Sequence, residues 1–157
     1  MKRSSLQVDY RPQLVFAVKY RQALIQPHWE KQLYQYITGI VQNRRHKMMA
    51  VNGMPDHVHI FLSMHPAEPV SVLVQEIKKA SSSFIRAEKF TPHRFQWQAG
   101  YGAFSYSKSH AQRVVRYVLK QKEHHYKKSF REEYLELLKA FEIEFQTEYL
   151  FDFFDVS

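Results

Sequence analysis

The sequence contains no cysteine. Disulfide bonds and thiolate metal sites are therefore excluded, and any metal ion has to be held by His, Asp, Glu, Gln or water. A chain of 157 residues without cross-links needs a hydrophobic core, and its 45% content of hydrophobic residues suits one globular protein. The lack of cysteine also agrees with a reducing compartment, so we expect a cytoplasmic location.

Long apolar runs are missing as well. No stretch approaches the roughly 20 apolar residues of a membrane span, and no apolar signal segment follows the first six residues. We therefore expect no membrane partner. Internal repeats, low-complexity tracts and linkers are also absent, which predicts a single domain over residues 1–157.

Acidic residues are scarce in most of the chain. The net charge is +8, yet residues 132–157 hold eight of the 15 acids and one of the 23 bases, so residues 1–131 carry +15. This basic body is interleaved with Tyr, Phe and Trp, a combination typical of nucleic-acid binding. A basic domain without such a partner could have the same composition, so charge alone does not decide.

Hydrophobic periodicity predicts the order strand, helix, strand, strand, helix, strand over about residues 10–108. This is an α+β fold of the ferredoxin-like βαββαβ type, with an antiparallel sheet and both helices on one face. Asn52-Gly53 is the expected hairpin turn. The predicted segments are strand 14–20, a helix from Pro27 to about Ile40, strands 48–51 and 57–63, a helix capped by Ser71, and strand 95–98.

Two histidines share one face of the predicted strand 57–63. His57 and His59 are two residues apart, so their side chains point the same way, while Val58, Ile60 and Leu62 take the other face. Neutral imidazole is the commonest side-chain metal ligand, and two on one face can reach one ion. The pair is either half of a metal site or two hydrogen-bonded histidines at a sheet edge.

A tyrosine stands off the apolar stripe of the helix predicted at residues 109–126. Tyr117 shares its face with Gln121 at i+4 and is flanked by Arg113 and Lys120. Gln121 is a candidate third metal ligand through its amide oxygen. The alternative is an ordinary exposed tyrosine on a solvated face.

The last segment, residues 130–157, is acidic and aromatic. So much apolar surface is unlike a disordered tail, and we expect it to pack on the domain or on a partner subunit.

Basic side chains near strand ends and on helices are candidate DNA contacts. The serines at 81–83 put small hydroxyls where a phosphate backbone could approach closely, although a solvated helix face is the alternative. The candidate basic residues are Lys19, Arg21, Lys78, Lys79, Arg86, Arg113 and Lys120.

Four stretches stand in one order over about residues 10–126. They are Val-Phe-Ala-Val-Lys-Tyr-Arg at 15–21, Met-Pro-Asp-His-Val-His at 54–59, Phe-Gln-Trp-Gln-Ala-Gly-Tyr-Gly at 95–102 and Tyr-Val-Leu-Lys-Gln at 117–121. Together they resemble the single-tyrosine HUH transposases of the insertion-sequence 200/605 family. The resemblance implies a ferredoxin-like fold, a single-stranded DNA partner, and cleavage and rejoining at transposon ends marked by hairpins.

The resemblance also implies roles for named residues. His57 and His59 would bind Mg²⁺ or Mn²⁺ with Gln121 as the third ligand, and Tyr117 would be the nucleophile. Attack on the phosphate would form a 5′-phosphotyrosine and free a 3′-OH. We expect the metal, Arg113 and Lys120 to favour the phenolate.

Relatives are homodimers whose active sites combine two subunits, so a homodimer is expected here, with cis or trans assembly open. Where relatives more often have asparagine before the glutamine, this chain has Lys120. Three other functions remain open: a non-catalytic hairpin or single-strand binder, a phosphodiesterase that uses water with a structural Tyr117, and a repeat-associated relative.

Overall fold

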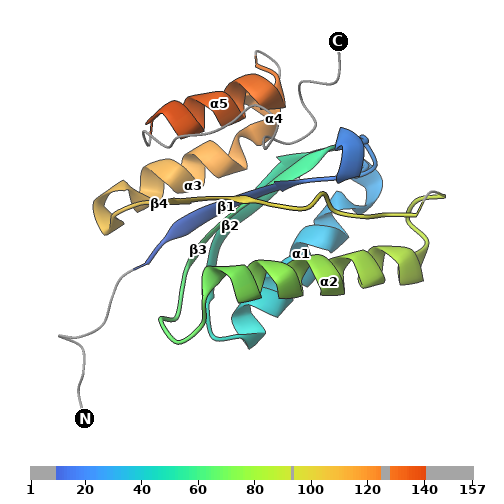
Figure 1. Ribbon diagram of the computed structural model, residues 1–157, viewed down its shortest axis with the longest axis horizontal. Coiled ribbons are helices and arrows are strands. Elements are labelled where there is room, and N and C mark those ends of the chain that lie inside the picture. The colour runs from blue at the N-terminus through green and yellow to red at the C-terminus, as the bar shows by residue number, and fades with distance from the viewer. Residues whose placement is uncertain (1–9, 93, 125–127, 141–157) are drawn as a thin grey trace.

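The computed structural model describes residues 10–92, 94–124 and 128–140 (Figure 1). Its first part follows the predicted order, and the α+β, ferredoxin-like prediction is confirmed. These elements are β1 (Pro12–Ala17), α1 (Pro27–Asn43), β2 (Lys47–Met54), β3 (His57–Ser63), α2 (Val70–Glu88) and β4 (Gly102–Ser105).

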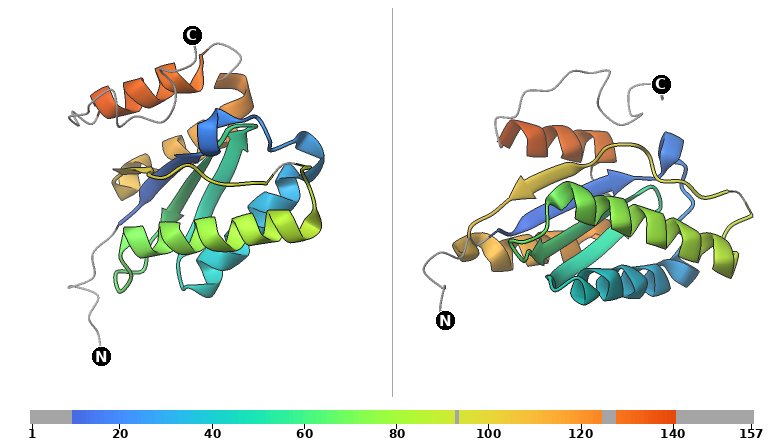
Figure 2. Two further views of the ribbon diagram at one scale, coloured as in Figure 1. Left: turned by 45° about the vertical axis from the view of Figure 1, so that its right-hand side comes forward. Right: turned by 60° about the horizontal axis from the view of Figure 1, so that its bottom comes forward.

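The four strands form one antiparallel sheet in the order β2-β3-β1-β4. Helices α1 and α2 lie side by side on one face of the sheet, as predicted, and the later helices cover the opposite face (Figures 1 and 2). No helix in the described part of the chain combines the length and apolar composition of a membrane span.

The main core lies between the sheet and the α1/α2 layer. Phe16, Val58 and Ile60 enter it from the two central strands, and Trp29 and Leu33 enter it from α1. The intervening residues of β1 face the opposite layer, so every residue of this strand is buried. This double coverage explains why the strand is a continuous apolar run in the sequence rather than an alternating one.

The predicted helix at 109–126 is interrupted. A 3₁₀ turn, η3 (Lys108–His110), leads into α3 (Ala111–Leu119), and α4 (Gln121–His124) follows after a break at Lys120. Next comes α5 (Phe130–Ala140), which packs on β1 and β4 of the same chain. The first part of the acidic segment thus covers its own domain, and the apolar stretch 143–154 lies outside the described residues.

The predicted hairpin turn at Asn52-Gly53 is wrong. Both residues pair within β2, Asn52 opposite His59 and Gly53 opposite Val58, and the turn is Pro55-Asp56. Gly53 is needed for a different reason. A Cβ there would collide with the backbone carbonyl oxygen of His57, so the glycine permits close approach of two strands.

The predicted fourth strand at 95–98 is also wrong, because β4 begins at Gly102. Phe95 is buried and Trp97 is half-buried in the α1/α2 core, so the alternation reflects packing. Trp97 makes only an isolated bridge, to Val18. Gly100, at φ +90°, then turns the chain toward the true edge strand.

Two glycine substitutions should have opposite effects on stability. Gly53→Ala should lower the free energy of unfolding by about 2 kcal/mol, because the clash is with backbone and one strand has to shift. Gly39→Ala, in helix α1 with open space around it, should raise stability by about 1 kcal/mol. Urea unfolding followed by circular dichroism measures both, and equal stability of the two variants would contradict the close-approach role of Gly53.

Candidate active site

The two histidines of β3 lie on the sheet face covered by α3 and α5. His57 pairs with Ala17 and His59 with Val15 of β1, and both imidazoles are fully buried. Their rings are 5.1 Å apart, centroid to centroid. The alternation of β3 therefore gives one face to the main core and the other to a pair of polar rings.

Each histidine is oriented by a hydrogen bond at its Nδ1 atom. Nδ1 of His57 is 2.8 Å from the Asp56 carboxylate, and Nδ1 of His59 is 2.6 Å from Oε1 of Gln13. Because the Nε2 of Gln13 donates to the Tyr106 hydroxyl, its Oε1 is the atom left to accept from His59. Nδ1–H donation keeps the Nε2 lone pair of each ring for a metal ion.

A carboxylate from α5 faces these Nε2 atoms. Oε1 of Glu133 lies 3.2 Å from Nε2 of His59 and 3.7 Å from Nε2 of His57. The three ligand atoms lie within 4.8 Å of one another and all three residues are buried. Two ligands that are each about 2.1 Å from one ion stand about 3.0–3.4 Å apart. The donor set thus fits a divalent ion after small adjustments.

Tyr117 and Gln121 reach the same carboxylate from the other side. The Tyr117 hydroxyl and the Nε2 of Gln121 both donate to Oε2 of Glu133, the latter at 2.9 Å. The Tyr117 ring stands edge-on to His59, with centroids 5.9 Å apart. The two residues predicted to share a helical face therefore meet at one point, although the helix breaks between them at Lys120.

The amide oxygen of Gln121 points to a further ligand. It is buried and accepts no hydrogen bond from the described residues. An unsatisfied buried acceptor is costly, and a cation or a water molecule bound to one would satisfy it. Gln121 thus remains a candidate ligand beside Glu133.

Sequence reasoning missed Glu133. Glu133 is one of eight acids in residues 132–157, a segment to which we assigned no role. Its place in the helical pattern nevertheless distinguishes it from the other acids. The buried residues of α5 are Phe130, Glu133, Tyr134 and Leu138, so an acid occupies a position of the apolar stripe. A carboxylate on such a stripe needs a buried partner, and that was the available signal.

The phenol of Tyr117 is held in its protonated form. Burial and the adjacent Glu133 carboxylate raise its pKa well above the usual value, whereas we expected Arg113 and Lys120 to lower it. Arg113 and Lys120 therefore do not by themselves favour the phenolate, because a carboxylate rather than a cation is the nearest charge, and the expected effect of a metal stays a prediction. Burial lowers the pKa of His57 to about 4, so its imidazole is neutral, the form that binds metals.

Helix α5 also covers the histidine pair. Phe130 stacks on His57, with ring centroids 3.7 Å apart and planes 2° from parallel. A small apolar cavity of about 210 Å³ opens beside the nucleophile candidate. Its lining residues are Tyr106, Arg113, Val114, Tyr117 and Leu137.

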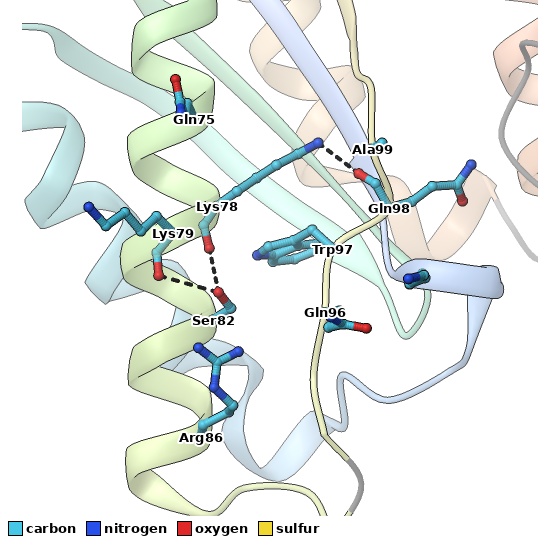
Figure 3. A pocket seen from close by; sticks show the side chains of 10 residues that line it. Gln75, Lys78, Lys79, Ser82, Arg86, Gln96, Trp97, Gln98 and Ala99 are labelled. Carbon is cyan, nitrogen blue, oxygen red and sulfur yellow. Dashed lines mark hydrogen bonds between the residues drawn. The ribbon is translucent and has the colours of Figure 1, made fainter.

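Six of the seven predicted DNA contacts fall in two places. Lys19, Lys78, Lys79 and Arg86 line one pocket of about 480 Å³ between α2 and residues 96–99 (Figure 3). Arg113 and Lys120 are exposed on and just after α3, on the other side of the sheet. Arg21 ends the 3₁₀ turn η2 (Lys19–Arg21) that follows β1.

The serines of α2 are less available to a phosphate backbone than we expected. Ser81 is buried, where its hydroxyl donates to the Ile77 carbonyl at 2.6 Å and accepts from Nε1 of Trp97 at 2.9 Å. Its role is therefore in packing and not at a phosphate. Ser82 lines the basic pocket while donating to the Lys78 carbonyl.

Comparisons with known proteins give a family match and similar solved structures. The family model described as "Transposase IS200 like" matches residues 7–121. A crystal structure of a candidate transposase from Deinococcus radiodurans R1 is 24% identical, with a TM-score of 0.59, covering 77% of this chain and 98% of that one. The structure of a REP-associated tyrosine transposase bound to a REP hairpin is 16% identical, with a TM-score of 0.54, covering 73% and 67%. No curated protein matches the chain.

Acidification should destabilise the metal-free protein through His57. Its pKa is about 4 in the folded state and about 6.5 when unfolded, so the unfolded chain binds more protons between these values and stability falls as pH falls. From pH 7 to pH 5 the loss due to His57 is about 2 kcal/mol. Urea unfolding in EDTA should show a smaller loss, by that amount, in His57→Gln. His28→Gln, at an exposed histidine, should behave like wild type, and an equal loss in wild type and His57→Gln would refute the effect.

Proposed function

The chain belongs to the IS200-like transposase family, and from this premise we propose that it cleaves and rejoins single-stranded DNA through a covalent bond to Tyr117. One observation carries the proposal. Tyr117, His57, His59 and Gln121, each singled out for chemistry, converge on the buried carboxylate of Glu133. A purely structural tyrosine has no need of a buried carboxylate that also faces two imidazoles.

The metal would be held by His57, His59 and Glu133, with the Gln121 amide oxygen as a further ligand. Imidazole and oxygen donors without thiolate suit Mg²⁺ or Mn²⁺, and Mn²⁺ matches imidazole better. Such an ion would neutralise charge on the phosphate oxygens.

The protein's own part is to present the nucleophile. The Tyr117 oxygen attacks the phosphorus, a Tyr–O–P bond forms, the P–O3′ bond breaks, and the DNA leaves with a free 3′-OH. Oε2 of Glu133 already accepts the phenol hydrogen bond and is the nearest acceptor for its proton, and the leaving 3′-oxygen takes up one proton in turn, so the step is balanced. The phosphotyrosine keeps the energy of the broken ester, so attack by a 3′-OH rejoins the strand without ATP.

The DNA substrate is proposed to carry a hairpin. Support comes from the similarity to the hairpin-bound REP-associated transposase and from the basic body of the chain. The expected homodimer, with its active sites assembled in cis or in trans, stays a prediction.

Tyr117→Phe should abolish the covalent adduct while keeping hairpin binding, because it removes one oxygen from a half-buried ring. The test is a denaturing gel with labelled single-stranded DNA from the flanks of the gene, with Mn²⁺ present. Tyr34→Phe, at a half-buried tyrosine of α1 on the other side of the sheet, is the matched control and should still form the adduct.

The adduct gel also separates the rival functions. An adduct that survives in Tyr117→Phe would disprove the assigned nucleophile. Cleavage by wild type without any adduct would favour a phosphodiesterase that uses water, and binding without cleavage would favour a non-catalytic hairpin binder.

Glu133→Gln should weaken metal binding, because it removes the anionic ligand at nearly constant volume. In wild type, Mn²⁺ at 100 times its dissociation constant should stabilise the fold by about 2.7 kcal/mol, and EDTA should stop cleavage. The stabilisation by Mn²⁺ and the cleavage activity should both be largely lost in Glu133→Gln and in the double variant His57→Ala, His59→Ala.

The control for this experiment is Glu136→Gln on the exposed side of α5, where the carboxylate pairs with Lys128. This variant should be stabilised by Mn²⁺ as much as wild type, measured as the rise in melting temperature on adding Mn²⁺. Unaltered cleavage by wild type in EDTA would contradict the metal role, and a normal Mn²⁺ shift in Glu133→Gln would exclude Glu133 as a ligand.

A further inference from the structure

The basic pocket at the edge of α2 gathers positive charge without a matching acid. Lys19, Lys78, Lys79 and Arg86 line it, and none of its described lining residues is Asp or Glu. Lys19 and Lys79 have no carboxylate partner among the described residues. An uncompensated cluster of this kind in a concave surface attracts a polyanion.

Two basic side chains of α2 hold the backbone that forms the opposite wall of the pocket. Lys78 reaches across to residues 98–100 and donates to the carbonyl oxygen of Gln98 at 2.8 Å (Figure 3). It also donates to the carbonyl oxygen of Gly100 at 2.6 Å. Arg86 donates to the Phe95 carbonyl at 3.1 Å. Two cations thus fix the backbone of one wall, and the exposed Lys79 and half-buried Lys19 remain for a ligand.

An aromatic side chain is presented beside this pocket at a strained turn. Tyr20 and Arg21 have φ of 59° and 53°, in the left-handed region that costs non-glycine residues of the order of 1 kcal/mol. The Tyr20 side chain is 66% exposed, and the Lys19 ammonium lies 5.4 Å from its ring centroid. Packing does not explain a strained, exposed tyrosine, whereas stacking of a nucleobase would.

The pocket and the active site lie at the same end of β1, the pocket on the α1/α2 side of the sheet and the histidines on the opposite side. The backbone NH of Gln98 donates to the carbonyl of Ala17, and the Lys19 NH donates to the carbonyl of Gln96. Ala17 in turn pairs with His57 on the neighbouring strand. Adjacent strands are about 4.8 Å apart, so a single strand held at the pocket is within a few nucleotides of the histidine pair.

We propose that the pocket between α2 and residues 96–99 binds single-stranded DNA next to the cleaved phosphate, with phosphates on Lys19 and Lys79 and a base stacked on Tyr20. This inference rests on the proposed function and states where the DNA substrate binds.

The shape favours a single strand over a hairpin stem. A cavity of about 480 Å³ can take an unstacked nucleotide, whereas the phosphates of a stiff duplex would meet only its rim. Half-buried Trp97 adds an apolar wall suited to the face or edge of a base.

Binding should be measured by fluorescence anisotropy in EDTA, so that no cleavage occurs, with labelled dT20 and a blunt 20-nucleotide hairpin as probes. The double variant Lys19→Ala, Lys79→Ala should bind dT20 about tenfold more weakly, and its salt slope should fall by about 0.7 for each lost contact. The hairpin should lose less affinity than dT20. The charge-matched control is Lys31→Ala, Lys47→Ala, two exposed lysines outside the pocket, which should keep wild-type dT20 affinity.

Tyr20→Asn separates binding from folding. Asparagine tolerates the left-handed backbone, so this variant should be at least as stable as wild type while binding dT20 about tenfold more weakly. The intrinsic fluorescence of Trp97 gives a reading on unmodified protein, because the other tryptophan, Trp29, is 1% exposed. Binding of dT20 should quench it, and Trp97→Phe should remove the quenching.

Three results would overturn the proposal: wild-type dT20 affinity in the Lys19/Lys79 variant, an equal loss in the Lys31/Lys47 control, or an equal loss for hairpin and dT20. The covalent adduct of wild type is scored separately. An adduct with unaltered dT20 binding in the variants refutes only the pocket, whereas specific dT20 binding without any adduct refutes only the proposed catalysis.

Discussion

The buried carboxylate of Glu133 is the contact on which this arrangement depends. A carboxylate removed from water is costly unless it is paired and hydrogen-bonded. Here it faces two imidazoles and accepts hydrogen bonds from Tyr117 and Gln121. It joins three parts of the chain, the β3 strand, the α3–α4 turn and α5, at one point. A divalent ion among these groups would offset the negative charge of the carboxylate.

The two faces of the sheet have different roles. One face, with α1 and α2, carries the large apolar core and the basic pocket at its edge, and the other carries the polar cluster under α3 and α5. This division follows from strand alternation, since Val58 and Ile60 point to the core while His57 and His59 point away. The face that stabilises the fold is therefore distinct from the face proposed for chemistry.

The errors of the sequence reading share a cause. Asn52-Gly53 and the alternation at 95–98 are real local signals, yet the glycine serves a close backbone approach and the alternation serves packing. Local patterns report which side of a segment is buried, and they do not report which strand it pairs with. The same gap hid Glu133, whose partner His59 lies 74 residues away in the sequence.

The sequence by itself determined the order of strands and helices, the face shared by His57 and His59, and the face shared by Tyr117 and Gln121, because these depend on the fixed periods of strand and helix. Only the tertiary structure decided that both pairs meet, that Glu133 lies between them, and that Lys19 lines one pocket with the basic residues of α2. Contacts between segments distant in the chain depend on how layers pack, and no local period encodes that packing.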